Sequence, residues 1–530
     1  MWRVRKQGYK TAPGLEELKR QRRIQESVLR KARREQHLIS KRLLLDEATA
    51  KEPLDDLESY ALSEEQVLQL ILDLRHGSTE KIKSLKTLRR SLQREDVQLM
   101  FVKAEGSIQL LVGLFTSSVT ELQQESIRCF HELSQSYNSA VSQSFLAATS
   151  YLITYLSGSC PEFTESCLYV LGNLIVEGEA IRNQLLLQGL IPALALCTQS
   201  PNMNVLEAVG YTLSQLLASK EAPEKIVPAV LEAKLIEGIL HHIQFESEDR
   251  IRVAVEFAWS LHYIISSQVI NRLLISQDLM PKLIQLLSNI SALVLKSTPP
   301  DLELLICPLV RCVANLLPDV STTGNNFQIH DGRLLAALFV FIEQYHKDHQ
   351  FLLAECLWAI SNLTVEEPVI ASAVLHYNMV PVLMSFLLTS PEIAAMVLTI
   401  LCNLAYLGPV YCEHLKQNNI LQCVISLLGS TDVHVTLRCL DIMIGLFKHC
   451  PDLAVDFLNN YGLKILEPYK NEIQFHDQVQ IIRNLCSMQV SYLFRYPFEV
   501  KSLDLGEFVY KPVNPDYCKT TARSAWTLPF

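Results

Sequence analysis

A short apolar motif, built around one Asn-like position, recurs along most of this chain and constrains its fold more than any other feature. Clear copies read LYVLGNLIVEG, AWSLHYIIS and LWAISNLTVEE, and weaker copies read RCFHELSQS and LDIMIGLFK. We call the Asn-like position of each copy its marker. The eight markers are 41 to 52 residues apart and stand at Glu132, Asn173, Gln215, Tyr263, Asn315, Asn362, Asn403 and Gly445. Such repeats bury their apolar faces against their neighbours, so we expect an elongated stack rather than one closed core.

The period of the repeat indicates which kind of stack forms. A period near forty residues, with two or three helices in each unit, is that of armadillo and HEAT repeats. The spacers agree, because an apolar residue followed by proline opens a helix at Ile191, Met280 and Val380. Polar insertions at 296–303 and 318–332 account for the two longest intervals. The sequence therefore predicts an all-α fold: an armadillo/HEAT-type right-handed superhelical solenoid, with about eight repeats over residues 65–480 and a basic helical arm at its N-terminus.

Charge divides the chain sharply near residue 45. Residues 1–44 contain 14 Lys and Arg and 4 Glu, a net charge of +10, whereas the whole chain carries −9 and residues 45–530 therefore carry −19. We interpret residues 1–45 as a basic arm that docks on an acidic surface, and 46–64 as a linker. Residues 481–530 are expected to form the C-terminal end and an irregular tail, to which the sequence assigns no role.

One segment leaves a membrane interpretation open. Residues 393–412, IAAMVLTILCNLAYLGPVYC, hold no charged residue, and their length reaches that of a membrane-spanning helix. The same segment contains the marker Asn403 at normal spacing, where the repeat predicts a helix buried between neighbours. We therefore favour a buried repeat helix and keep a membrane anchor as the alternative.

The sequence lacks the motifs that mark several classes of protein function. The chain contains no P-loop, G-x-G-x-x-G, H-E-x-x-H or G-x-S-x-G motif, so an enzyme is not expected. The 14 cysteines are scattered without a C-x-x-C pair, which favours reduced core thiols over a metal site. We expect no cofactor and no metal. Nucleic-acid binding is not favoured, because residues 45–530 are acidic and no nucleic-acid-binding motif is present.

An aromatic residue stands four positions before several markers, as Trp358 does before Asn362 and Trp259 before Tyr263. Residues i and i+4 share one face of a helix. A row of such pairs could bind an extended peptide, since an amide both donates and accepts hydrogen bonds and aromatic faces attract cations. The alternative is structural: the amide ties one repeat to the next and the aromatic ring is core. The spacing alone does not separate the two.

The order of these copies resembles the ladder of the importin-α-like armadillo-repeat family. In YVLGNLIVEG, Glu177 stands at the acidic position that accepts a lysine in that family. WSLHY resembles the family's repeat in which Tyr replaces the Asn. VRCVAN resembles the repeat in which an arginine, here Arg311, replaces the Trp. WAISN resembles the repeat that has an acidic residue upstream, here Glu355. The resemblance implies a groove that binds basic nuclear localisation signals of cargo proteins. Its peptide-binding residues here would be Tyr169, Asn173, Glu177, Tyr211, Gln215, Trp259, Tyr263, Asn315, Glu355, Trp358, Asn362 and Asn403.

The arm resembles the same family. GLEELKRQRRIQESVLRKARREQHLISKR, residues 14–42, is similar to its importin-β-binding domain. The resemblance implies importin-β as a partner and a location in cytoplasm and nucleus, the membrane being the alternative location. The contacting residues would be Lys19, Arg20, Arg22, Arg23, Arg30, Lys31, Arg33, Arg34, Lys41 and Arg42. A helix with so little apolar surface is expected to order mainly on its partner.

The ladder also departs from the family's pattern. The first copy has Arg128 and Glu132 in place of Trp and Asn, Tyr169 and Tyr211 replace Trp, and Thr399 stands at an aromatic position. These changes predict weaker binding of a bipartite signal. A nuclear import adapter is therefore the leading interpretation, and a scaffold that has kept the fold without signal recognition is the alternative.

Overall fold

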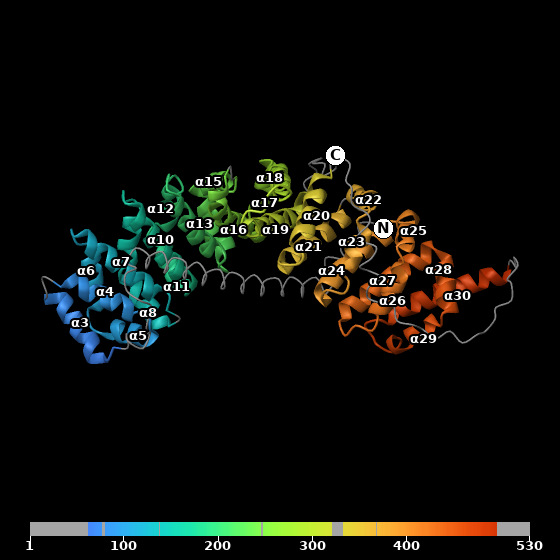
Figure 1. Cartoon of the computed structure of the whole chain (residues 1–530), viewed down its shortest axis with the longest axis horizontal. Coiled ribbons are helices and arrows are strands. Elements are labelled where there is room, and N and C mark those ends of the chain that lie inside the picture. Colours follow the sequence, from blue (N-terminus) through green and yellow to red (C-terminus); the bar gives the residue numbers. More distant parts are fainter. Residues whose placement is uncertain are drawn as a thin grey trace. The chain divides into compact units, whose positions relative to one another are not determined.

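The protein is a stack of short helices in two compact units. The computed structural model describes residues 62–76, 80–136, 138–244, 247–320, 332–366 and 368–495, and every regular element in these ranges is a helix. The N-terminal unit comprises residues 54–325, and the C-terminal unit includes residues 326–530. Figure 1 shows the short helices following one another along the chain in both units. The predicted all-helical repeat fold is confirmed.

In the N-terminal unit each repeat contributes a first, a second and a longer third helix. The elements are α3 (Glu64–His76), α4 (Lys81–Ser91), α5 (Glu95–Lys103), α6 (Ser107–Phe115), α7 (Thr120–Ser134), α8 (Ser139–Ser144), η2 (Phe145–Ala147), α9 (Thr149–Tyr155), α10 (Pro161–Val176), α11 (Glu179–Leu187), α12 (Leu190–Cys197), α13 (Met203–Leu217), η3 (Ala222–Ile226), α14 (Val227–Glu232), α15 (Leu235–His242), η4 (Glu248–Arg250), α16 (Ile251–Ser267), α17 (Asn271–Ser276), α18 (Leu279–Val294) and α19 (Leu302–Val320).

The C-terminal unit continues with the same arrangement. Its elements are α20 (Arg333–Tyr345), α21 (Gln350–Glu366), α22 (Pro368–His376), α23 (Val380–Ser385), α24 (Pro391–Tyr406), α25 (Pro409–Gln417), α26 (Ile420–Leu427), α27 (Val433–His449), α28 (Pro451–Asn459), α29 (Gly462–Leu466), η5 (Glu467–Tyr469) and α30 (His476–Arg495).

The third helices form the spine of each unit. In the N-terminal unit α7, α10, α13, α16 and α19 pack in succession, and in the C-terminal unit α21, α24, α27 and α30 do the same. All eight markers lie on these helices. The marker spacing in the sequence is therefore the spacing of the third helices along the stack.

The turn between first and second helices has a common backbone signature. A residue with φ between 50° and 85° stands at this turn in seven repeats, and these residues are Gly106, Gly189, Lys234, Asp278, Asn378, Asn419 and Tyr461. This left-handed conformation suits glycine and costs about 1–2 kcal/mol for most other residues. In five of these repeats the second helix then begins on Leu, Ile or Val, and proline follows in its first turn at Pro192, Pro281 and Pro381. The proline openings predicted from the sequence are thus helix starts.

Polar caps fix where several third helices begin. The side chain of Asn202 accepts from two backbone N–H groups of α13, Asp432 does the same for α27, and Ser390 accepts from Ile393 at the start of α24. These bonds satisfy N–H groups that have no partner within the helix, each contributing about 1 kcal/mol.

The apolar segment 393–412 is divided between two helices. α24 ends at Tyr406, Gly408 has φ 130°, and α25 starts at Pro409. Most α24 residues of the segment are buried against neighbouring helices. Within the residues that the structure describes, no single helix has both the length and the apolar character to cross a membrane. Two sharply bent helix pairs, α5 with α6 and α11 with α12, meet the length and composition criteria together.

The predicted ends of the chain are only partly covered. Residues 1–61 and 496–530, which hold the predicted arm and most of the tail, lie outside the described residues. The predicted boundary at residue 480 falls inside α30, which runs from His476 to Arg495. The last described helix therefore extends past the predicted end of the repeats.

Close packing of third helices gives a direct test of the stack. A Cβ atom added at Gly210 in α13 would lie 2.7 Å from Cβ of Glu256 and 3.3 Å from Cδ2 of Phe257, both in α16. We expect Gly210→Ala to lower the free energy of unfolding by about 1–3 kcal/mol, because the two helices must separate to admit the methyl group.

The matched control is Gly113→Ala in α6. A Cβ atom there meets nothing within 4 Å, and alanine is the better helix former by about 0.5–1 kcal/mol. Chemical denaturation of both variants measures the difference. Equal stability of the two variants would contradict the observed closeness of α13 and α16.

Candidate functional site

The predicted peptide-binding residues lie on the third helices of both units. In the N-terminal unit α10 holds Tyr169 and Asn173 with Glu177 as its C-cap, α13 holds Tyr211 and Gln215, α16 holds Trp259 and Tyr263, and α19 holds Asn315. In the C-terminal unit α21 holds Glu355, Trp358 and Asn362, and α24 holds Asn403. The structure therefore brings the residues of each unit onto successive helices, as the spacing predicts.

Exposure divides these residues into two groups. Seven are buried, with at most 9% of their surface exposed: Tyr169, Asn173, Tyr211, Trp259, Glu355, Trp358 and Asn403. The other five are half-buried: Glu177, Gln215, Tyr263, Asn315 and Asn362. The half-buried group is the part of the ladder that a ligand can reach without rearrangement. Peptide binding by either group stays a prediction.

The carboxamide of Asn173 forms hydrogen bonds to the third helices on both sides of it. Its Nδ2 donates to Oγ of Ser134 at 3.0 Å, and its Oδ1 accepts from the Tyr211 hydroxyl at 2.9 Å. Asn173 is 0% exposed. The hydrogen bonds from Ser134 through Asn173 to Tyr211 thus link α7, α10 and α13. In this position the marker amide ties one repeat to the next, which is the structural interpretation that the spacing alone had left open.

Asn403 and Asn315 also bond to the preceding third helix. Asn403 Nδ2 donates to the Ser361 carbonyl oxygen and to Thr364 Oγ1, each at 3.1 Å. Asn315 Nδ2 donates to Ser266 Oγ at 3.4 Å. Marker amides therefore serve as ties between repeats in both units.

Trp259 is covered on one side by an arginine of the chain itself. The guanidinium carbon of Arg311 lies 5.4 Å from the centre of the Trp259 ring, and Arg311 is 4% exposed. The Tyr263 ring stacks on the same indole with centroids 6.1 Å apart. A cation–π contact of this kind contributes about 0.5–2 kcal/mol, and here α19 supplies the cation.

The first copy of the ladder forms an ion-pair cluster. Arg128 bonds to Glu125 at 2.6 Å, and Nε of Arg89 lies 3.3 Å from the other carboxylate oxygen of Glu125. Arg89 and Glu125 are both buried. Arg89 of α4 thus holds the carboxylate of Glu125 in α7, and Arg128, which stands where the family has Trp, pairs with the same carboxylate from within its own helix.

Carboxylates surround the ladder of the N-terminal unit. Burial raises the pKa of the Tyr169 phenol well above its ordinary value, and the charges of Glu207, Glu165 and Glu256 raise it further. These three carboxylates come from α13, α10 and α16, so their fields overlap at one point of the stack. The arrangement favours cations over anions along these helices.

Sequence reasoning missed Ser134, Ser361 and Thr364, the partners of the marker amides. Each is a small hydroxyl residue within two positions of a marker, at Glu132 or Asn362. Their spacing offers a weak signal, since serine and threonine are common in such helices. The carboxylates Glu165, Glu207 and Glu256 were also missed, although Glu165 and Glu207 stand four residues before Tyr169 and Tyr211.

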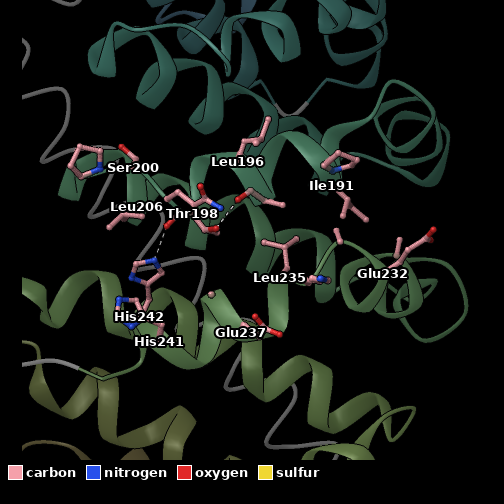
Figure 2. Close-up of a pocket in the computed structure, with 18 of the residues that line it drawn as sticks. Ile191, Leu196, Thr198, Ser200, Leu206, Glu232, Leu235, Glu237, His241 and His242 are labelled. Carbon is pink, nitrogen blue, oxygen red and sulfur yellow. Dashed lines mark hydrogen bonds between the residues drawn. The ribbon is translucent and has the colours of Figure 1, made fainter.

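A separate cavity of about 1270 Å³ lies away from the ladder, between α12 and α15 (Figure 2). Ile191 and Leu196 line it from α12, and Leu235, His241 and His242 line it from α15. None of the predicted peptide-binding residues lines this cavity. Its rim mixes lysine and arginine with glutamate, so its charge selects no class of ligand.

His242 ties the two sides of this cavity together. Its Nε2 lies 2.9 Å from the carbonyl oxygen of Thr198, which can only accept, so Nε2 carries the proton. Nδ1 then accepts from Arg250 at 3.4 Å. Burial lowers the pKa of His242, and the neighbouring charges of His241 and Arg250 act in the same direction. The ring is therefore held in its neutral form.

The described residues offer no group of three or more His, Cys, Asp or Glu side chains arranged to hold a metal ion. Their cysteines are free thiols, and most are buried. Burial raises the pKa of Cys439 to about 12 and that of Cys197 to about 11, so both stay protonated at neutral pH.

Comparison with known proteins gives two family matches, and the individual proteins that the chain resembles include the following two. The sequence model of the TMCO6 family matches residues 67–488, and that of the importin beta binding domain matches residues 5–101. The chain is similar to importin subunit alpha-9 of Arabidopsis thaliana, at 24% identity over 368 residues, 67% of this chain and 66% of that protein. It thus spans just under two thirds of the length of that relative. The crystal structure of an engineered protein matches with a TM-score of 0.61 and 15% identity, over 80% of this chain and 99% of that one, a likeness of fold.

The tie through Asn173 predicts a measurable loss of stability. Tyr211→Phe removes the hydroxyl 2.9 Å from Asn173 Oδ1 and leaves that oxygen buried without its donor. We expect the free energy of unfolding to fall by about 1–3 kcal/mol, the usual cost of a buried unsatisfied acceptor. Tyr151→Phe in α9 is the matched control, because Tyr151 is 46% exposed. Equal denaturation midpoints for the two variants would refute the tie.

His242 predicts a pH dependence of stability. Its pKa in the folded protein is below the ordinary value of 6.5. As the pH falls below about 6.5, His242 binds a proton in the unfolded chain but stays neutral in the folded protein, so the free energy of unfolding decreases. We expect His242→Gln to reduce this decrease between pH 6.5 and the lowered pKa. The exposed His241→Gln serves as the control in denaturation experiments across that range, and an unchanged pH profile for His242→Gln would disprove the prediction.

Proposed function

Because this chain belongs to the TMCO6 family and its residues 5–101 match the importin beta binding domain, we propose that it is an adapter for nuclear import. In this role the basic arm binds importin-β, and the third helices bind cargo proteins through basic signal peptides. The adapter moves between cytoplasm and nucleus. No step of this role requires a cofactor or an enzymatic reaction.

The observation that carries the proposal is the coincidence of the domain match with the charge of the arm. Residues 1–44 hold a net charge of +10, and the matched region begins at residue 5. Basic side chains spaced along one helix form many charge-assisted bonds to an acidic surface, and their combined field speeds the encounter. Ten of them are assigned to this contact: Lys19, Arg20, Arg22, Arg23, Arg30, Lys31, Arg33, Arg34, Lys41 and Arg42.

Cargo binding is supported by the electrostatics of the N-terminal unit. The carboxylates of Glu165, Glu207 and Glu256 act together on Tyr169, so α10, α13 and α16 share a negative potential. Half-buried groups such as Gln215, Tyr263 and Asn362 remain partly accessible on the same type of helix. A basic peptide is the ligand class that these groups fit.

A second candidate is a scaffold that uses the fold without recognising basic signals. The ties at Asn173 and Asn403 favour it, because those amides already bond to neighbouring helices. The two candidates differ in one property: only the adapter requires a peptide to bind on the third helices.

Reversing the charge of the arm tests the adapter. We expect Arg30, Lys31, Arg33 and Arg34 changed together to Glu to abolish capture of importin-β by the full-length chain, because attraction becomes repulsion over the length of the helix. In the unaltered chain, capture should weaken as salt rises, since exposed charges are screened beyond about 10 Å at 0.1 M ionic strength.

The matched control reverses four exposed cations in the repeats, Arg272, Lys282, Lys296 and Lys347, which gives the same change in net charge. It should bind importin-β as the unaltered chain does. If the two variants capture importin-β equally well, the role assigned to the arm is ruled out. It is also ruled out if the unaltered chain and both variants all fail to capture importin-β.

A further inference from the structure

Positive charge is concentrated on α4, although the chain beyond the arm is acidic. Residues 81–94, which cover α4 and the turn after it, read KIKSLKTLRRSLQR and hold six cations and no acid. Two of the six, Arg89 and Arg94, pair with carboxylates of the chain. Lys83 and Lys86 are exposed, and their spacing of three residues places them on one face of the helix. α4 therefore presents a basic surface to solvent.

The ion pair between Lys83 and Glu80 leaves this surface basic. Oε2 of Glu80 lies 4.0 Å from Nζ of Lys83, and the two side chains are 74% and 79% exposed. A pair so open to water is weak, because the solvent screens both charges. A further carboxylate can thus approach Lys83 without having to displace a strong partner.

An uncovered apolar pair lies on α3, the neighbouring helix. Leu68 and Leu72 are each 46% exposed, and their spacing of four residues places them on one face. α3 packs against α4, and only residues 77–80 separate the two helices in the chain. Leu72, near the end of α3, and Lys83, near the start of α4, therefore lie at the same end of the pair. We call the two leucines with Lys83 and Lys86 the α3–α4 face.

The segment that precedes α3 has a composition that complements this face. Residues 54–61 read LDDLESYA, with three carboxylates and no cation, and Leu54, Leu57 and Tyr60 alternate with the acids. The segment lies outside the described residues, which begin at residue 62. It thus joins the stack directly beside the face, and it carries both the charge and the apolar side chains that the face lacks.

The start of α3 allows the segment to return along this helix. Ser63 and Gln66 form a capping box: the Ser63 N–H donates to Oε1 of Gln66 at 2.8 Å, and the Gln66 N–H donates to Oγ of Ser63 at 3.3 Å. A capping residue has non-helical backbone angles, so the chain can change direction at Ser63. Eight residues reach about 26 Å when extended, and the 13 residues of α3 are about 20 Å long. Residues 54–61 can therefore reach both leucines and the end of α3 where α4 begins.

We propose that residues 54–61 dock on the α3–α4 face of the same copy of the chain. Their apolar side chains cover the two leucines of α3, and their carboxylates pair with the two lysines of α4. The docked segment caps the first described helices of the stack, whose exposed leucines need a cover. It also keeps three carboxylates away from the cations of the arm. The docking is a contact within one chain and does not depend on the adapter role.

Zero-length crosslinking tests the contact in the full-length chain. A carbodiimide joins a carboxylate to an amine that it touches, and mass spectrometry identifies the joined peptides. We expect Asp55 or Asp56 to be joined to Lys83 or Lys86. The link between Glu80 and Lys83 is the internal control, because these side chains are 4.0 Å apart. Mixing copies that contain normal and heavy nitrogen separates links within one chain from links between copies.

Protease accessibility measures how firmly the segment is held. Chymotrypsin cleaves after leucine and tyrosine, so cleavage within residues 54–61 follows the fraction of released segment. We expect Lys83→Glu with Lys86→Glu to speed this cleavage about tenfold. Adding Asp55→Lys and Asp56→Lys should restore the rate to within about threefold of the unaltered chain, because the opposite charges are then exchanged.

The matched control for these charge changes is Lys282→Glu with Lys296→Glu, two exposed lysines elsewhere in the N-terminal unit. It should leave the cleavage rate unchanged.

The apolar half of the contact has its own variants. Leu68→Ser with Leu72→Ser should speed cleavage of the segment about tenfold, since the apolar cover is lost. Leu187→Ser with Leu196→Ser is the control, because these leucines are 89% and 64% exposed and lie on α11 and α12. Thermal melting verifies that every variant is folded.

Docking on the α3–α4 face is refuted if Asp55 and Asp56 are joined only to lysines of the arm, or only across two copies. It is also refuted if they are joined to no lysine of α4 while the control link forms. Should the control link fail, the cleavage rates decide: equal rates for the face variants and their controls refute the docking. Capture of importin-β enters neither measurement, so failure of the adapter role leaves the docking standing, and the reverse holds as well.

Discussion

Packing of one third helix on the next is the interaction on which the rest of the structure depends. Each repeat has too little apolar surface to fold alone, so its third helix is held by the helix before and the helix after it. Hydroxyl groups reinforce the apolar contact, as when Thr212 in α13 donates to the Leu168 carbonyl oxygen in α10 at 2.8 Å. The first and second helices then cover this spine.

Because of this packing, one row of side chains has two competing uses. A marker amide that bonds to a neighbouring helix stabilises the stack, and the same bond withholds the amide from a ligand. Asn173 has both ends engaged by Ser134 and Tyr211, so its contribution goes to stability. Arg311 over Trp259 is the aromatic counterpart, since the chain supplies the cation that a ligand would otherwise bring. At these residues the side chains of the ladder hold neighbouring third helices together.

The sequence predicted the helical repeats and the shared helix face of each aromatic residue and its marker, because apolar periodicity and marker spacing are local properties of the chain. It could not predict the left-handed turns at Lys234, Asp278 and Tyr461, since those residues give no glycine signal and the conformation is imposed by packing of the flanking helices. The partners of Asn173 and Asn403 were also missed. Ser134 and Thr364 each stand 39 residues before the amide whose hydrogen bond they accept, but only the packing of neighbouring third helices turns that spacing into a contact.

The arm and the ladder respond differently to sequence change, for a physical reason. Attraction between a basic helix and an acidic surface sums over many charges, and at 0.1 M salt it acts over about 10 Å, so single substitutions alter it little. A hydrogen bond of a marker amide depends on the position of one or two atoms, as that between the Tyr211 hydroxyl and Asn173 does, so a single substitution removes it. For the proposed adapter role, this difference means that single substitutions on the third helices alter cargo binding more than single substitutions in the arm alter binding of importin-β.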